Sequence, residues 1–428
     1  MTLGWGQIVR LGLVQLCIGS VVVLTTSTLN RLMVVELALP AILPGALVAL
    51  HYALQMSRPA FGLRSDTKGN RTAFIIGGMA ALGLGTFLAA LAVAIYPLAG
   101  WQALALSVFA YVLIGFGVGA SGTSLLALLA SGTDPRRRAA AATITWLMMI
   151  FGIAVTAGVV GSLLDPYSPV RLLWIVAAVA LIAVTVTTAA VWGIERKLGA
   201  PATEEASVRL IDGLREVWAE PQARRFTLFI FLSMTAYFLQ ELILEPYAGL
   251  VFGFTAGETT KLTSVQHQGV FLGMATVGLA LSGLKIGTLR GWVVAGCLGS
   301  AAAIAGVAAM GQVEGGRILP AVWALGYFNG VFAVSAVGAM MSLAGEGRSA
   351  REGTRMGLWG AAQGIAAGFG GLLGAGAADV MRLVLPDATA FGVVFGAQAL
   401  LFIVAAMMAT GTVAARGAAR VPTVMAGE

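Results

Sequence analysis

Apolar residues fill twelve long runs of this chain, and short polar segments separate each run from the next. A helix needs about 20 apolar residues to cross the hydrocarbon core of a bilayer. The runs cover residues 11–35, 41–61, 72–96, 102–130, 140–164, 171–193, 226–248, 266–287, 291–311, 318–344, 356–378 and 390–413. We therefore predict an all-α integral membrane protein with twelve transmembrane helices.

One longer polar segment, residues 195–225, divides the twelve runs into six and six. The division predicts an N-terminal six-helix half over residues 1–194, a linker over 195–225 and a C-terminal six-helix half over 226–428. A short amphipathic helix on the membrane surface is expected within the linker, near residues 207–218.

Basic residues gather in alternate loops. If the N-terminus lies in the cytoplasm, both termini, the linker and the other cytoplasmic loops hold 21 of the 26 Lys and Arg residues. The positive-inside rule therefore predicts cytoplasmic termini. The net charge of +7 does not indicate a nucleic-acid partner, because these residues are spread over separate short loops.

Composition agrees with a membrane protein whose helices pack closely. Hydrophobic residues make up 58% of the chain and charged residues only 11%. The 57 glycines suit helices whose backbones approach one another in a membrane. Cys17 and Cys297 each fall in an apolar run, so we interpret them as small core residues and not as a disulfide or a metal site.

Two six-helix halves with both termini inside resemble the major facilitator superfamily. The segment GLRSDTKGNR after the second run resembles the loop signature of that superfamily, with Thr67 in place of a usual basic residue. The matching residues are Gly62, Asp66, Lys68, Gly69 and Arg71. The resemblance implies a structural loop in which Asp66 caps a helix N-terminus or pairs with an arginine.

Three further segments point to one family. TLNRLMVVELALPA (28–41), LQELILEPYAGLVFGF (239–254) and GTRMGLWGAAQGIAAGFGGLLGAGAAD (353–379) resemble the PucC family of light-harvesting assembly factors. One shorter branch of that family carries the label bacteriochlorophyll synthase 44.5 kDa chain, which we take as a name and not as evidence of an enzyme.

The resemblance implies a non-enzymatic factor that binds bacteriochlorophyll and delivers it during light-harvesting complex assembly. The implied location is the bacterial inner (intracytoplasmic) membrane. The implied partners are antenna polypeptides of LH1 or LH2, bacteriochlorophyll synthase and membrane lipid. Carotenoid or lipid would accompany the pigment as further bound molecules.

Two histidines lie in the predicted spans. The magnesium of a bacteriochlorophyll commonly takes a neutral imidazole nitrogen as its axial ligand. His51 is expected near the bilayer midplane and His267 near the periplasmic start of the eighth span, so we expect the loss of His51 to lower bound pigment more. Each histidine could instead bond to a neighbouring helix and tighten packing. The candidate pigment contacts are His51, Gln55, His267, Trp359 and Gln363.

The eleventh run carries glycines at helical spacing. Gly360, Gly364 and Gly368 repeat every four residues, and Gly370 and Gly374 continue the strip. Such bare backbone predicts a seat for another helix. A macrocycle or an isoprenoid tail is the alternative occupant, with Trp359 and Gln363 beside it.

Polar residues cluster near the predicted periplasmic ends of the first and seventh spans. Buried charges need partners, so these groups are expected to form a salt bridge between helices, hold a gate shut or carry a proton. They also support the alternative function, a major facilitator transporter of a small solute or pigment precursor. The residues are Asn30, Arg31, Glu36, Gln240, Glu241 and Glu245.

Other chemistry finds no matching motif. The sequence has no Gly-x4-Gly-Lys-Ser/Thr loop, no cysteine cluster and no Asp-rich pair for a prenyl diphosphate. The glycines of GFGVGASG (115–122) fit a membrane helix and not a dinucleotide-binding turn, which would follow a strand. We therefore predict no catalytic residues and no protein-held metal.

Overall fold

The computed structural model describes residues 2–58, 61, 70–134, 137–195, 218–284, 286–313, 315–346 and 352–413. These residues form helices and connecting turns without a strand. Ten helices are long and apolar enough to cross a membrane, and a shorter apolar helix covers Ile42–Ser57. Together with α12 (Ala256–Leu279), they account for all twelve predicted spans.

The N-terminal half begins with an irregular first helix. It runs as α1 (Trp5–Val23) and continues through two π-helical turns, Leu24–Leu29 and Leu32–Glu36. The other helices of this half are α2 (Ile42–Leu54), which ends in the 3₁₀ turn Gln55–Ser57, α4 (Arg71–Ala99), α5 (Trp101–Gly132), α6 (Arg138–Leu163) and α7 (Pro169–Val191).

The C-terminal half contains a broken helix at the corresponding place. The seventh span is divided into α10 (Pro221–Leu239) and α11 (Leu244–Phe252). After α12, which continues into the π-helical turn Ala280–Leu284, come α13 (Leu289–Met310), α14 (Leu319–Glu346), α15 (Glu352–Arg382) and α16 (Asp387–Thr412).

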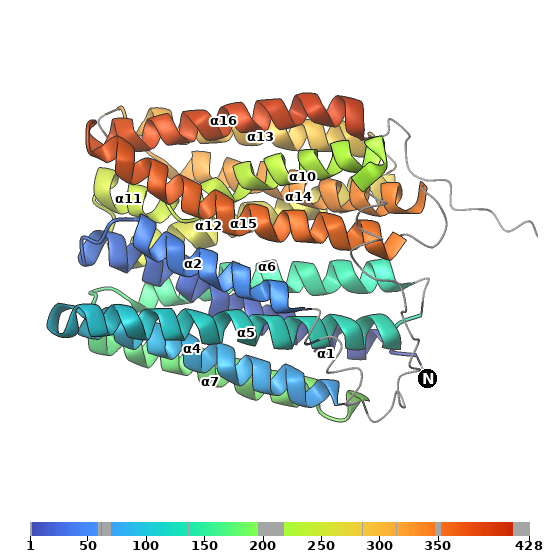
Figure 1. The fold of residues 1–428 in the computed structure, drawn as a ribbon, viewed down its shortest axis with the longest axis horizontal. Helices are drawn as coiled ribbons and strands as arrows, with labels where there is room; N and C mark the ends of the chain where they lie inside the picture. Colours follow the sequence, from blue (N-terminus) through green and yellow to red (C-terminus); the bar gives the residue numbers. More distant parts are fainter. Residues whose placement is uncertain are drawn as a thin grey trace, which may run out of the picture.

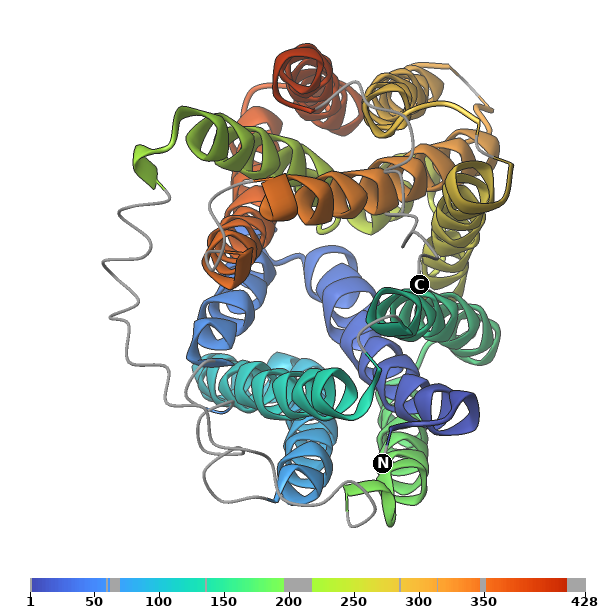
Figure 2. The same ribbon diagram turned by 90° about the vertical axis from the view of Figure 1, so that its right-hand side faces the viewer.

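The two halves lie side by side with their helices roughly parallel to one long direction (Figures 1 and 2). Each half has its own apolar core. One includes Ile75, Tyr111 and Leu172, and the other includes Phe226 and Phe332. The boundary between the halves, which we call the seam, is formed mainly by α1, α2 and α6 on one side and by α11, α12 and α15 on the other.

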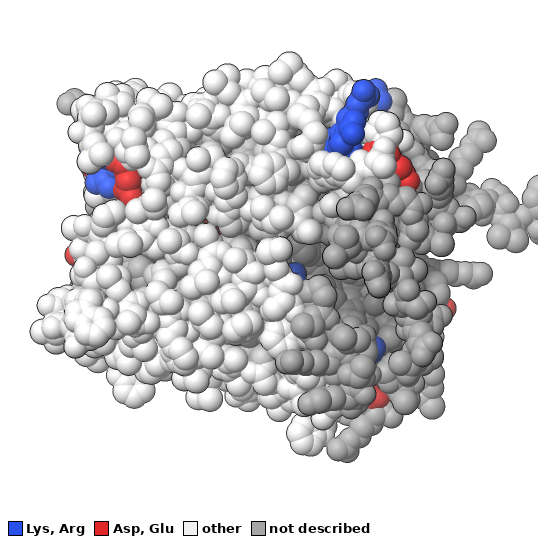
Figure 3. All heavy atoms as spheres, in the orientation of Figure 1, with Lys and Arg blue, Asp and Glu red and all other residues white. Residues whose placement is uncertain are grey.

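Charged side chains avoid the middle of the molecule. On the face drawn in Figure 3, the atoms of Lys, Arg, Asp and Glu lie mainly toward the two ends of the bundle. A band without charge between two charged ends is what a bilayer requires of the surface that faces lipid. The protein is therefore a multi-pass membrane protein.

Glycines allow the close helix packing that composition predicts. A side chain at Gly326 of α14 would place its Cβ 1.9 Å from the carbonyl oxygen of Gln266 in α12, so only glycine fits there. Cys17 and Cys297 are both buried and unpaired, as expected of small core residues.

The eighth span starts earlier than predicted, which corrects the expected depth of His267. A capping box starts α12: Thr255 Oγ1 accepts from the amide of Glu258, and Glu258 Oε2 accepts from the amide of Thr255. His267 lies eleven residues after the first residue of α12, whereas His51 lies nine after the first of α2. At 1.5 Å per residue these depths are about 17 and 14 Å, so the two histidines sit at similar levels.

Part of the predicted loop signature falls outside the described residues, namely Gly62, Asp66, Lys68 and Gly69. The expected surface helix at 207–218 does so too, except for its last residue.

Arg71 of the signature begins α4, and a carboxylate from the end of the N-terminal half caps this helix. Glu195 Oε1 accepts from the amide of Arg71 at 2.7 Å, and its Oε2 accepts from the amide of Thr72 at 2.8 Å. Asn70 Oδ1 also accepts from the amide of Ala73 at 3.1 Å. Capping here therefore involves side chains that the signature did not indicate.

Candidate functional site

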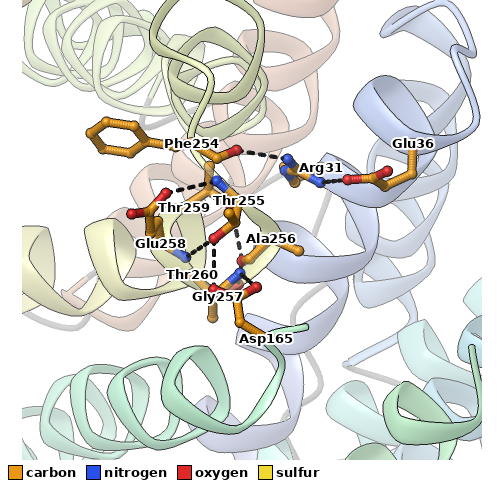
Figure 4. A network of polar contacts seen from close by, with 10 residues as sticks. All are labelled: Arg31, Glu36, Asp165, Phe254, Thr255, Ala256, Gly257, Glu258, Thr259 and Thr260. Carbon is orange, nitrogen blue, oxygen red and sulfur yellow. Dashed lines mark hydrogen bonds and ion pairs between the residues drawn. The ribbon is translucent and has the colours of Figure 1, made fainter. Parts of the chain in front are cut away.

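A carboxylate at the end of α6 caps the first turn of α12 across the seam. Thr255 Oγ1 donates to Asp165 Oδ2 at 2.6 Å, and the amide of Gly257 donates to Asp165 Oδ1 at 2.9 Å (Figure 4). A helix N-terminus favours a negative charge because its first amides are unpaired and its dipole points there. This contact therefore fixes the N-terminal half to the C-terminal half.

A second carboxylate makes the reciprocal contact. Asp379 of α15, in the C-terminal half, accepts from the amides of Ala41 and Ile42 at the start of α2, at 3.0 and 2.7 Å. Helices α2 and α12 begin at the same end of the bundle, opposite the N-terminus (Figure 1), and we call it the far end. The two capping carboxylates close the seam at the far end from both halves.

Sequence reasoning did not identify these two aspartates. A signal was present, because Asp165 and Asp379 each stand at or just beyond the end of an apolar run in a chain with only 19 acidic residues. Their partners, however, are backbone amides of distant helices, which no local pattern reveals.

Arg31 joins the same end of the seam. Its Nη1 forms an ion pair with Glu36 of the same helix, and its Nη2 donates to the carbonyl oxygen of Phe254 in the C-terminal half at 2.9 Å (Figure 4). The structure therefore pairs Arg31 with the nearby Glu36, and a carbonyl supplies the contact across the seam.

Glu245 lies deeper in the seam and is almost completely buried, with an exposed fraction of 3%. Its Oε1 accepts hydrogen bonds from Ser27 Oγ of the N-terminal half and from Thr263 Oγ1 of α12. One turn away, Asn30 Nδ2 donates to the carbonyl oxygen of Leu242 at 2.8 Å, in the break of the seventh span. These groups form a buried polar contact between the first and seventh spans.

The other two predicted polar residues have different surroundings. Gln240 accepts from Gln398 Nε2 at 2.5 Å and so belongs to the interior of the C-terminal half. Glu241 is partly exposed, and its carboxylate lies within electrostatic reach of Tyr52 and Tyr237.

His51 is buried and already engaged through one ring nitrogen. Its Nε2 lies 2.9 Å from Gln55 Nε2, and Arg58 donates to Gln55 Oε1. Because the Gln55 amide nitrogen can only donate, His51 Nε2 accepts and the ring proton belongs on Nδ1, which has no partner. The row His51, Gln55 and Arg58 therefore occupies the ring nitrogen that most often binds a metal.

His267 has the arrangement expected of a ligand. Its Nδ1 lies 2.9 Å from the carbonyl oxygen of Thr263, so it donates and leaves Nε2 with a free lone pair. The residue is partly exposed and follows Thr263 by one helical turn, on the same face of α12. Among the described residues, no three His, Cys, Asp or Glu side chains gather as a metal site, but a chlorin magnesium needs only one imidazole.

Trp359 and Gln363 pack inside the C-terminal half. Trp359 is 1% exposed and contacts Phe226 edge to face, with ring centroids 4.8 Å apart. Gln363 Nε2 lies 3.6 Å from the sulfur of Met234. Both face α10, so packing occupies the side chains predicted to contact a ring.

The glycine strip of α15 has two parts. A Cβ at Gly370 or Gly374 would lie 2.7 or 2.2 Å from a backbone carbonyl of α10, and one at Gly368 would touch α2. These three glycines seat helices. A Cβ at Gly360 or Gly364 would meet nothing within 4 Å, so that part of the strip is open.

An apolar groove of about 310 Å³ lies between α4 and α5. The rings of Phe61 and Phe116 meet edge to face at one wall, with centroids 6.2 Å apart. The other lining residues are Ala73, Phe74, Gly77, Gly78, Ala81, Gly117 and Ala120. Such a lining suits hydrocarbon.

Comparison with solved structures shows the fold. A bacterial homologue of the human drug peptide transporters PepT1 and PepT2 has a TM-score of 0.71 at 14% identity, covering 95% of this chain and 97% of its own. The nucleoside transporter NupG has a TM-score of 0.68 at 16% identity, covering 95% and 98%. These neighbours are major facilitator transporters, so the predicted fold is confirmed.

Comparison with known sequences shows the family. The chain is 80% identical over 428 residues, the full length of both, to a Rhodobacter capsulatus protein named bacteriochlorophyll synthase 44.5 kDa chain. It is 30% identical to Protein PucC of Rhodobacter capsulatus, covering 93% of this chain and 90% of that one. The profile of the PUCC protein family matches residues 28–417. The chain therefore belongs to the PUCC family.

Proposed function

We propose that the protein is a non-enzymatic membrane assembly factor that binds bacteriochlorophyll and delivers it during light-harvesting complex assembly. The observation that carries this proposal is the 80% identity, over the whole chain, to a relative named for bacteriochlorophyll synthesis. Membership of the PUCC family and the major facilitator-like fold support a carrier rather than a catalyst.

We assign the magnesium ligand to His267 rather than to His51. His267 holds its ring with Nδ1 and keeps Nε2 available, whereas His51 uses Nε2 for Gln55. The partial exposure of His267 also supports access from the space beside the seam. A bound bacteriochlorophyll would supply the pigment chemistry, and the imidazole would orient and hold it.

The proposed setting follows from charge and family. The distribution of 21 of 26 basic residues supports cytoplasmic termini in the bacterial inner (intracytoplasmic) membrane. The proposed recipients are antenna polypeptides of LH1 or LH2, with bacteriochlorophyll synthase as the source of pigment. The apolar groove between α4 and α5 suits a carotenoid or lipid chain.

A spectrum tests this function directly. The protein, purified in mild detergent from cells that make the pigment, should carry bacteriochlorophyll absorption. A deletion strain should contain less antenna complex. Absence of bound pigment together with normal antenna levels in the deletion strain would overturn the proposal.

The alternative is transport of a small solute or pigment precursor. The seam favours it, because capping contacts close one end as expected for one state of an alternating-access carrier. Saturable uptake of a precursor into proteoliposomes would support transport, and pigment binding without any such flux would support the assembly factor.

A further inference from the structure

The first and seventh spans are both irregular where they meet. The first contains the π-helical turns Leu24–Leu29 and Leu32–Glu36, and the seventh is interrupted between Leu239 and Leu244. Irregular turns within a membrane helix free backbone groups and often mark functional sites. The polar contact of Glu245 lies at this meeting point.

Two buried oxygens in this contact lack a hydrogen-bond donor. Glu245 uses Oε1 for the hydroxyls of Ser27 and Thr263, while its Oε2 has no partner. Asn30 uses Nδ2 for the carbonyl of Leu242, while its Oδ1 has no partner. Ser27 and Asn30 are three residues apart on one span, and Leu242 and Glu245 are three apart on the other, so both oxygens belong to the same contact.

The charged groups around Glu245 do not supply a dedicated counter-ion. Arg31 of the first span already pairs with Glu36 and with a carbonyl across the seam. Glu241 precedes Glu245 by one turn and has the same sign of charge. On α12, Lys261 is exposed, and His267 uses Nδ1 for a backbone carbonyl.

An ionised Glu245 would therefore hold an unpaired negative oxygen in the protein interior, which is strongly unfavourable. One added proton changes both deficits at once. A proton on Oε2 turns an unpaired acceptor into a donor, and Asn30 Oδ1 is an acceptor in the same contact. Oε1 then acts as the carbonyl oxygen that accepts from Ser27 and Thr263.

We propose that Glu245 is a proton-binding site built into the seam between the two halves. Ser27 and Asn30 belong to one half, and Glu245 and Thr263 to the other. The protonated carboxyl therefore holds the halves together. Loss of the proton leaves a charge that needs water, so proton release is linked to opening of the seam. This inference is independent of pigment binding.

Infrared spectroscopy of the full-length protein tests the site. The carbonyl stretch of a protonated carboxyl should be present in the wild type and shift in D₂O. Glu245→Gln should remove it. The matched control is Glu258→Gln, because Glu258 is an exposed carboxylate on α12 and glutamine also serves at that position of a capping box. The control should leave the band unchanged.

Two milder variants keep the test decisive if Glu245→Gln does not fold. Ser27→Ala and Thr263→Val each remove one hydroxyl that donates to Oε1. Each should shift the band to higher frequency, because the carbonyl oxygen loses a hydrogen bond. A purely structural role for Glu245 would leave no such band to shift.

Two results would overturn the proposal. The first is a carboxyl band of equal intensity in wild type and Glu245→Gln, or a wild type without that band at both acidic and alkaline pH. The second is a melting temperature that rises with sodium chloride, replaced mole for mole by choline chloride, in wild type but not in Glu245→Gln. That dependence would assign the site to a sodium ion.

Discussion

Asp379→Asn should weaken the closed far end of the seam. The carboxylate receives two amides at the start of α2, one on each oxygen. Asparagine keeps one acceptor oxygen but presents an amide nitrogen, itself a donor, to the other backbone N–H. The variant also removes a negative charge from a helix N-terminus.

The magnitude follows from these contacts. A hydrogen bond to a charged acceptor contributes about 1.5–3 kcal/mol, and the helix-end charge contributes about 0.3–1 kcal/mol. The Asp379 side chain is 19% exposed, so water replaces part of the loss. A net cost of about 2 kcal/mol shifts the equilibrium toward the open far end by about 30-fold.

Thiol labelling can measure this shift. Ala256→Cys, in a background with Cys17→Ala and Cys297→Ala, places a small thiol in the seam, because Ala256 is 3% exposed and packs against the N-terminal half. Its reaction with a membrane-impermeant maleimide requires the seam to open. The labelling rate should rise by about 30-fold in Asp379→Asn, in proportion to the open population.

Asp387→Asn is the matched control. Asp387 accepts from Arg382, which also lies 4.0 Å from Asp379, but both partners of that bond are in the C-terminal half. Its rate should stay near that of the parent. Equal labelling rates in Asp379→Asn and Asp387→Asn would refute the role of this contact in closing the seam.

The remaining predictions concern the pigment ligand, the glycine strip and a helix cap. His267→Ala should lower the bacteriochlorophyll absorption of the purified protein more than His51→Ala, and equal pigment content would contradict the assignment. Gly374→Ala should lower the free energy of unfolding by about 1–3 kcal/mol, whereas Gly360→Ala should change it by less than about 0.5 kcal/mol; detergent unfolding curves in the opposite order would contradict the reading of the strip. Glu195→Ala removes the carboxylate from the first amides of α4 and should cost about 1 kcal/mol, seen as a lower melting temperature, and an unchanged one would show that water replaces the cap.

The long apolar runs determined the twelve spans because a bilayer leaves the backbone few alternatives to a helix. The eighth span was placed ten residues late for a related reason. Its first turns, which include Glu258 and Lys261, are polar and enter the helix through a capping box that hydropathy does not register.

The partners of the charged residues could not be read in the same way. The ion pair of Arg31 and Glu36 spans five residues, which suits the π-helical turn found there, whereas ordinary helices bring together residues three or four apart. The ranking of the two histidines also reversed, because it depends on which ring nitrogen a neighbour occupies.

The sequence by itself determined that this is a twelve-helix membrane protein of the PUCC family, since span length and family segments are local properties of the chain. Only the tertiary structure decided that Asp165 and Asp379 cap helices of the opposite half and that Glu245 is buried between the first and seventh spans. These contacts join residues 90 or more positions apart, except for Thr263 beside Glu245, and they exist only because the two halves dock along one seam.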